Sequence, residues 1–191
     1  ACAIAAEGYA RVSNKIGIAY VTTGPGGTNA ITGVYGAWVD SIPTMIISGQ
    51  VKFQTTIASQ PQLNLRQLGD QEVNIIDIVK PITKYAVMIT DKNSIKFHLQ
   101  KAVYEAKHGR PGPVWLDVPL DIQGAMVDEA DLVEFKIPEE PKFDTKIPQV
   151  LDALKAAKRP VIIVGNGVTL AGANEDFLKL IEILKIPVIG T

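Results

Sequence analysis

The stretch VTTGPGGTNAITG, Val21–Gly33, follows a short apolar run and opens a segment with helical spacing. The run before it, Ile16–Val21, is β-branched and continuously apolar, which predicts a parallel strand covered on both faces. A helix over Thr28–Val39 and a strand over Thr44–Val51 follow. Strand, glycine loop, helix and strand in this order predict a right-handed parallel unit, in which ligands collect at the carboxyl ends of the strands.

The flanking sequence extends the same pattern. An alanine-rich helix is expected over Ala1–Arg11 and an amphipathic helix over Ser94–Lys107, with further strands at Ala86–Ile89 and Val114–Val118. The polar, glutamine-rich residues 52–72 have no clean period and predict a long loop, which in compact domains is usually functional or mobile. The fold class predicted is therefore α/β, a parallel sheet flanked by helices.

The second part of the chain predicts a different domain. Residues 123–146 are acidic and proline-punctuated, as expected of a linker between a domain at 1–122 and one that begins at 147. Residues 147–191 read as helix, strand, glycine turn, helix and strand, the first α/β unit of an incomplete Rossmann-like domain. Because the chain opens in mid-helix without Met or a capping residue, we expect upstream sequence, so that the first domain is truncated at its N-terminus.

Composition limits the classes of partner. The formal net charge is −1 with no basic run, which gives no reason to expect nucleic acid or an anionic membrane as partner. With Cys2 as the only cysteine, an intrachain disulfide is impossible, and a reducing, cytoplasmic setting fits best. His98 and His108 have no close partner in the sequence, so we expect no metal site in this chain.

Neither glycine turn is a phosphate loop by its own residues. No Gly-Lys-Ser/Thr follows Gly24 or Gly26, and GNGVTLAG, which contains Gly165 and Gly167, matches GxGxxG only in part. Taken alone, both predict strand-to-helix turns that use glycine for positive φ and close packing. The aspartates at strand or helix ends are expected to be mainly caps. These are Asp40, Asp117 and Asp121.

Taken together, the consecutive motifs resemble the thiamine diphosphate (ThDP)-dependent acetolactate synthase and decarboxylase family. The matching strings are AAEGYARVSNKIGIAYVTTGPGGTNAITGVYGAWVDSIPTMIISGQV, DQEVNIIDIVKPITKYAV and GRPGPVWLDVPLDI, which together cover nearly all of Ala1–Ile122 in the right order. Residues 123–146 and RPVIIVGNGVTLAGA then look like the start of the family's central domain.

The resemblance implies an N-terminal pyrimidine-binding domain, a central domain and a C-terminal diphosphate-binding domain, in a homodimer or tetramer whose active sites lie between two subunits. It places the essential glutamate just upstream of Ala1, so that Glu7 must not be mistaken for it. It places the Mg²⁺ and diphosphate motif beyond Thr191. We therefore expect this chain alone to be inactive.

The resemblance also assigns roles to residues present here. Gly24, Pro25 and Gly26 match the loop that packs against the aminopyrimidine, and Asn29 matches a position that lines it. Gln71 matches a glutamine that faces the reacting carbon. Two further assignments are Lys84 near the substrate channel and an FAD site at Gly165 and Gly167, where relatives also bind another nucleotide or nothing.

The function implied is decarboxylation of a 2-keto acid and transfer of the acyl unit to a carbonyl acceptor, by a transferase or lyase that could also be a flavoprotein. Asp70 stands where an apolar aromatic is expected, which favours a larger or more polar acceptor such as a sugar over pyruvate. The alternative is a non-catalytic nucleotide-binding or subunit-interface module of the same fold. A glutamate just upstream of Ala1 and a GDG-type motif near the C-terminus of the gene product would discriminate between the two.

Overall fold

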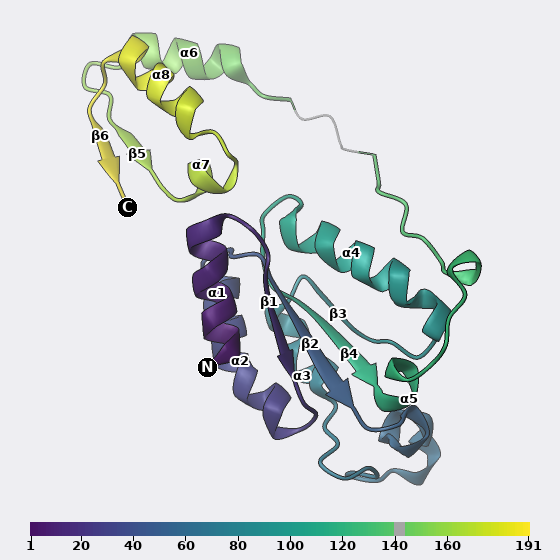
Figure 1. The fold of residues 1–191 in the computed structure, drawn as a ribbon. Coiled ribbons are helices and arrows are strands. Elements are labelled where there is room, and N and C mark those ends of the chain that lie inside the picture. Colours follow the sequence, from purple (N-terminus) through teal and green to yellow (C-terminus); the bar gives the residue numbers. More distant parts are fainter. Residues whose placement is uncertain (140–143) are drawn as a thin grey trace. The chain divides into compact units, whose positions relative to one another are not determined.

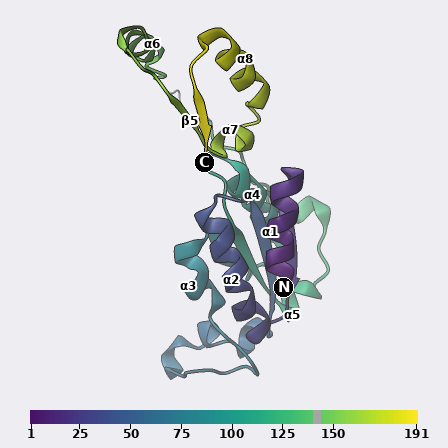
Figure 2. The same cartoon turned by 90° about the vertical axis from the view of Figure 1, so that its left-hand side faces the viewer.

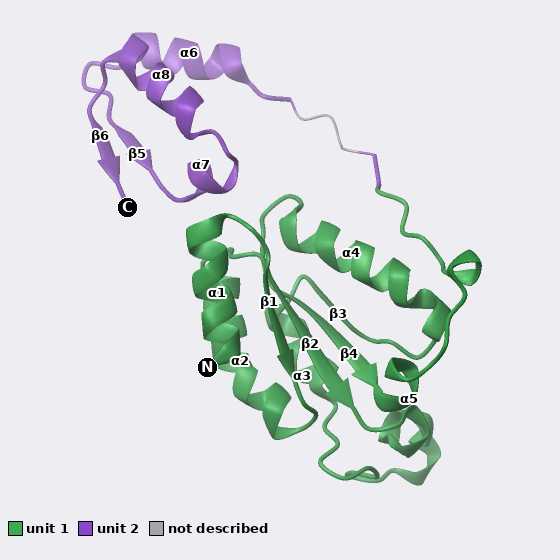
Figure 3. Cartoon of the chain, in the orientation of Figure 1, with its two compact units in different colours: residues 1–137 green, residues 138–191 purple. Residues whose placement is uncertain are grey.

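The computed structural model describes residues 1–139 and 144–191. The chain divides into two compact units, residues 1–137 and residues 138–191 (Figure 3). Each unit has a parallel sheet of its own, so the fold is α/β throughout, as the sequence predicted. The first unit carries the Val21–Gly33 stretch and is described first.

Four parallel strands form the sheet of the first unit (Figure 1). They are β1 (Gly17–Val21), β2 (Thr44–Gln50), β3 (Tyr85–Met88) and β4 (Val114–Pro119), in the spatial order β1-β2-β4-β3. The register places Ser48 of β2 opposite Asp117 of β4. All four carboxyl ends therefore meet at one edge of the sheet, which we call the carboxyl edge.

Helices cover both faces of this sheet (Figures 1 and 2). On one face lie α1 (Cys2–Ser13), α2 (Pro25–Val39) and α3 (Ile75–Val79); on the other lies α4 (Ile95–Lys107). Alternate strand residues serve the two faces, as the pleat of a strand requires. The core on the first face is centred on Ala19, Ile46 and Trp115, and that on the α4 face on Met45, Val114 and Leu116.

Strand β1 differs from the prediction of a strand covered on both faces. Its residues alternate between buried and exposed, with Ile18 52% and Tyr20 72% exposed. The reason is its place at the edge of the described sheet, where α1 covers one face but α4 packs over the other strands. The continuous apolar run of β1 is therefore not a sign that both of its faces are buried.

Helices α1 and α2 approach closely because small residues line their contact. A Cβ at Gly33 would lie 2.8 Å from the Cβ of Ala3, which is closer than real side chains come. At the far end of the contact, Arg11 binds both Glu7 (2.6 Å) and Asp40 (2.5 Å), which raises the pKa of the guanidinium. Glu7 thus has a structural partner on its own helix.

The carboxylate of Glu72 binds the long loop after β2 at several points of its backbone. It contains three short 3₁₀ turns, η1 (Phe53–Thr55), η2 (Ile57–Ser59) and η3 (Pro61–Leu63). The Glu72 carboxylate accepts hydrogen bonds from the backbone N–H groups of Ile57 (2.6 Å), Leu68 (3.0 Å) and Gly69 (3.1 Å). Glu72 therefore fixes the loop at the point where it returns to the sheet.

The chain after β4 runs back along α4. It passes through α5 (Leu120–Gln123) and the 3₁₀ turn η6 (Glu129–Asp131). Earlier in the chain, the 3₁₀ turns η4 (Lys80–Ile82) and η5 (Lys92–Ser94) flank β3. Val133 N donates to Asn93 O (3.0 Å), and Lys96 pairs with Glu134 (2.5 Å). Residues 123–137, predicted as linker, thus belong to the first unit.

The second unit contains α6 (Ile147–Ala156), β5 (Ile162–Val164), α7 (Gly167–Leu170), α8 (Asn174–Leu184) and β6 (Val188–Gly190). Strands β5 and β6 pair in parallel. Across both units, the described helices are too short or too polar to cross a membrane.

Candidate functional site at the carboxyl edge

The glycine loop connects β1 directly to α2. Gly24 precedes the helix with φ +59°, a left-handed conformation that favours glycine, and Pro25 occupies the first turn. Pro25 has no N–H, and the Gly26 N–H already donates to Thr23 O (3.3 Å). Two of the donors that a phosphate would use at this helix start are therefore missing or engaged. The loop is built for close approach of backbone to a neighbour.

That neighbour within the chain is Gln71. A Cβ at Gly24 would lie 2.3 Å from Gln71 O and 3.2 Å from Gln71 Cβ, so the two residues are packed backbone to backbone. Gln71 itself has φ +57°, which is uncommon for a residue with a side chain. The fold thus brings together the glycine loop and the glutamine that the family resemblance assigns to the site.

Polar groups tie these two loops to the sheet beneath them. Thr23 Oγ1 donates to Gln50 Oε1 (2.8 Å), and Gln50 Nε2 donates to Val73 O (3.1 Å), two residues after Gln71. Gln50 also donates to Asp117 Oδ2 (3.0 Å). The last residue of β2 therefore contacts both loops and the neighbouring strand.

Asp117 lies at the base of this network. It is fully buried in β4, where Ser48 Oγ donates to Oδ1 over 2.5 Å and the Trp115 indole N–H donates to Ser48 Oγ over 2.8 Å. Burial raises the pKa of Asp117 to about 6, against the hydrogen bonds from Ser48 and Gln50, which lower it. The expectation that Asp117 caps a turn is wrong, because it points into the interior from within a strand.

An open groove of about 800 Å³ lies over the carboxyl ends of β1, β2 and β4. The uncharged polar residues that line it are Thr22, Thr23, Ser48, Gln50 and Gln123. Its other lining residues are Tyr20, Val21, Ile47, Gly49, Val51, Val118 and Leu120. The groove is therefore continuous with the glycine loop and large enough for one ring of a cofactor or a small substrate.

The remaining predicted residues fall in three places. Pro25 and Asn29 are exposed in the first two turns of α2, on the same edge as Gln71. Lys84 lies at the opposite, amino-terminal edge, where its ammonium donates to the carbonyls of Glu105 and His108 and burial lowers its pKa. Its position before β3 separates it from the glycine loop.

The two residues proposed for FAD belong to the second unit. Gly167 begins α7, which ends at Leu170, and open space surrounds a Cβ placed at Gly167. A helix of one turn has little dipole to offer a phosphate group. The described ranges 1–139 and 144–191 also hold no group of three or more His, Cys, Asp or Glu side chains placed to bind a metal ion.

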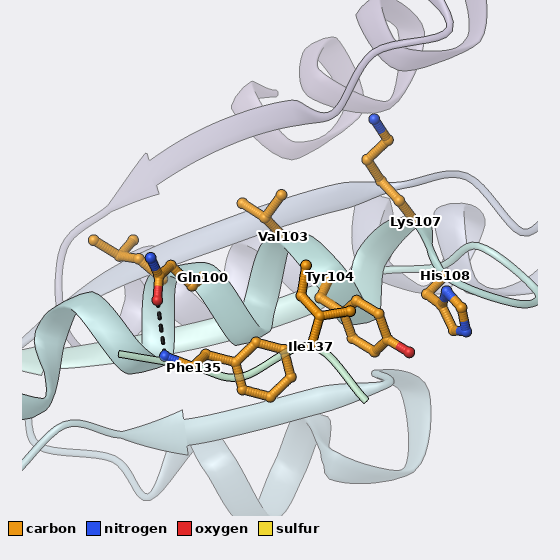
Figure 4. Close-up of a pocket in the computed structure, with 8 residues that line it drawn as sticks. Gln100, Val103, Tyr104, Lys107, His108, Phe135 and Ile137 are labelled. Atoms are coloured by element: carbon orange, nitrogen blue, oxygen red, sulfur yellow. Dashed lines mark hydrogen bonds between the residues drawn. The ribbon is translucent and has the colours of Figure 1, made fainter. Parts of the chain in front are cut away.

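A second hollow lies on the outer side of α4, away from the carboxyl edge (Figure 4). Tyr104 of α4 and Phe135 of the returning chain form its aromatic walls, and Gln100 Oε1 accepts a hydrogen bond from Phe135 N (2.8 Å). The lining is otherwise mainly apolar: Leu99, Val103, Lys107, His108 and Ile137. This hollow lacks the converging polar groups of the carboxyl edge.

Sequence reasoning missed Ser48 and Gln50. Both lie in TMIISGQV, the run predicted as a buried strand, and both are indeed buried. A buried polar side chain needs hydrogen-bond partners, so a serine and a glutamine two residues apart on one face of a strand are a usable signal. The same signal applies to Asp117 within VWLDVP.

Comparisons with known proteins agree with this architecture. Residues 1–72 match the family model for the thiamine pyrophosphate enzyme N-terminal TPP binding domain, and residues 147–191 match the model for the central domain of the same enzymes.

Individual relatives agree with the family match. The acetolactate synthase large subunit of Lactococcus lactis is 36% identical over 190 residues, covering 97% of this chain. The probable acetolactate synthase large subunit of Methanococcus aeolicus is 37% identical over 201 residues, covering 100% of the chain. Isozyme 3 of Escherichia coli, also an acetolactate synthase large subunit, is 34% identical over 194 residues, covering 96%. In each case the chain spans 32% of the relative's length.

Proposed function

Because this chain belongs to the thiamine pyrophosphate enzyme family, we propose that its carboxyl edge forms the aminopyrimidine wall of a ThDP site. The observation that carries the proposal is the packing of Gly24 on Gln71, which brings together two segments that the family resemblance assigns to the site. We further propose that the gene product decarboxylates a 2-keto acid and transfers the acyl unit to a carbonyl acceptor, as relatives named acetolactate synthase suggest.

The residues present fit this group. Gly24 lets the glycine loop pack directly on Gln71, since any Cβ at this position would displace Gln71. Pro25 offers an apolar ring face, and the exposed Asn29 amide offers both a donor and an acceptor to the edge of a heteroaromatic ring. Backbone, apolar and amide contacts of this kind suit a flat, neutral pyrimidine better than a phosphate, which is assigned to another domain.

The chemistry of the reaction would be supplied by bound ThDP, which would serve as the electron sink for loss of carbon dioxide from the substrate. The chain's own contribution is to position the cofactor and the substrate and to exclude water from them. Gln71, exposed beside the loop, can donate its amide N–H to the carboxylate or carbonyl of a 2-keto acid. Glu72 holds the loop that carries Gln71 through three backbone hydrogen bonds.

Several finer assignments complete the proposal. The first unit, residues 1–137, contains the pyrimidine-binding domain assigned to residues 1–122, and residues 147–191 open the central domain, with Mg²⁺ and the diphosphate bound elsewhere in the gene product. The enzyme is a cytoplasmic homodimer or tetramer in which a partner completes each active site. Asp70 beside Gln71 favours a polar acceptor. FAD at Gly165 and Gly167 would have to bind without a long helix at its phosphates, because α7 has only 4 residues.

Calorimetry of the complete gene product with ThDP and Mg²⁺ tests the function. We expect saturable binding, and release of carbon dioxide from a 2-keto acid such as pyruvate. A gene product that binds no ThDP would instead be a non-catalytic module of the same fold. ThDP binding without decarboxylation would retain the cofactor site and overturn the proposed reaction.

A further inference from the structure

The side-chain amide of Gln50 makes four hydrogen bonds at the carboxyl edge. Its Oε1 accepts from Thr23 Oγ1 (2.8 Å) and from the Val51 N–H (3.1 Å). Its Nε2 donates to Val73 O (3.1 Å) and to Asp117 Oδ2 (3.0 Å). A primary amide has two N–H donors and two acceptor lone pairs, so the capacity of the group is fully used. With Gln50 only 4% exposed, water cannot readily replace these partners.

The surroundings allow only one orientation of this amide. The Val73 carbonyl and the ionised Asp117 carboxylate can only accept, and the Val51 N–H can only donate. If the amide were rotated by 180°, its oxygen would face Val73 O and Asp117 Oδ2, and its NH₂ group would face the Val51 N–H. Asp117 is itself fixed by the hydrogen bond from Ser48, so the orientation is transmitted from the interior of the sheet.

The two loops joined by Gln50 are those that carry the proposed cofactor and substrate contacts. Thr23 directly precedes Gly24, and Val73 lies two residues after Gln71. Gly24 and Gln71 touch through their backbones, and the hydrogen bonds of the described residues include none between these two that would set their spacing. A connection through a rigid, buried amide would hold that spacing.

We propose that Gln50 is a positioning residue, which sets the spacing between the glycine loop and Gln71 by holding Thr23 and Val73 to one oriented amide. The inference rests on the function proposed above. It predicts that ThDP affinity depends on the donor and acceptor pattern of residue 50, and not only on its size.

The variant Gln50→Glu tests this pattern at nearly constant shape. When ionised, the introduced carboxylate would present oxygen to both Val73 O and Asp117, the one ionisable side chain that contacts this amide among the described residues. When protonated, the introduced carboxyl group would regain one donor. We therefore expect the Kd for ThDP to rise about tenfold at alkaline pH, as for loss of a buried hydrogen bond to a charged group, and to recover at acidic pH.

The matched control is Gln62→Glu, which makes the same charge change at an exposed glutamine in the loop after β2. Its Kd for ThDP should follow the wild type across the pH range. A second variant, Thr23→Val, removes the hydroxyl that donates to Gln50 Oε1, without adding a charge. It should weaken ThDP binding severalfold with no added pH dependence, and it serves where Gln50→Glu does not fold.

Calorimetric titration with ThDP and Mg²⁺, with the melting temperature as a check on folding, separates the outcomes. Wild-type affinity for Gln50→Glu at every pH, or wild-type affinity for Thr23→Val, would overturn the positioning role. A loss of affinity in Gln50→Glu that does not recover at acidic pH would assign Gln50 a structural role only, and would overturn it too. If the wild-type protein binds no ThDP, it is the proposed function that fails.

Discussion

Gly24 and Gln71 lie in direct backbone contact although 46 residues of strand, helix and loop, residues 25–70, separate them in the chain. Both residues have positive φ, +59° and +57°. Glycine adopts positive φ readily, whereas for Gln71 it is a strained conformation, which persists where the surrounding structure over-determines it. Glu72 and Gln50 supply the restraints on either side of Gln71.

Gly24→Ala should damage both the fold and the site. The backbone conformation, φ +59° and ψ −116°, alone costs an alanine about 1–3 kcal/mol, and the added Cβ would meet Gln71 O at 2.3 Å. We expect a lower melting temperature and weaker ThDP binding, measured by calorimetry. The control is Gly8→Ala in α1, where no atom lies within 4 Å of the added Cβ; it should leave ThDP binding intact and stabilise the helix by about 0.5–1 kcal/mol. Equal ThDP affinity in Gly24→Ala and wild type would argue against a cofactor role for the loop.

Asp117→Asn should remove a pH dependence of stability. The folded pKa of Asp117 is raised by burial to about 6 from its ordinary value of 3.8. A raised folded pKa means that the folded state retains its proton longer, so the contribution of Asp117 is fully present below 3.8 and is lost as pH rises through about 6. Relative to Asp117→Asn, the wild type should lose about 3 kcal/mol over this interval. Melting curves of both proteins from acidic to neutral pH measure the difference, and a constant difference would contradict the assignment.

Ser48→Ala should destabilise the same network from the other side. It removes the donor to Asp117 Oδ1 and the acceptor of the Trp115 indole N–H, so that two buried groups lose a partner at once. A cost of about 1–3 kcal/mol per unsatisfied group is expected. Because the hydrogen bond from Ser48 lowers the pKa of Asp117, the variant should also shift the loss of stability to higher pH. Chemical denaturation at several pH values checks both effects; Ser13→Ala, at the end of α1, should change stability by less than about 0.5 kcal/mol.

The sequence predicts the sheet class and the elements around the glycine loop because local periodicity reports them. It does not predict the network of Gln50 and Asp117, which lie 67 residues apart and meet only through the pairing of β2 with β4. The register between strands is a property of the whole sheet, so a strand over Val114–Val118 could be predicted, but not that Asp117 within it bonds across to β2 instead of acting as a cap. In strand β1 the local pattern misleads, since an apolar run does not show which face of the strand a helix covers.

Gln71→Asn should separate stability from substrate recognition. Asparagine tolerates the left-handed conformation better than glutamine, so the free energy of unfolding should stay constant or rise by up to about 1 kcal/mol. The shorter side chain withdraws the amide by one methylene, so we expect a higher KM for the 2-keto acid with unchanged ThDP affinity. The mirror-image control is Asn64→Gln, at φ +46° in the exposed part of the loop after β2, which should lower stability without changing KM. Steady-state kinetics and denaturation on the complete gene product measure both quantities. An unchanged KM in Gln71→Asn would show that this amide does not contact the substrate, whatever the effect on stability.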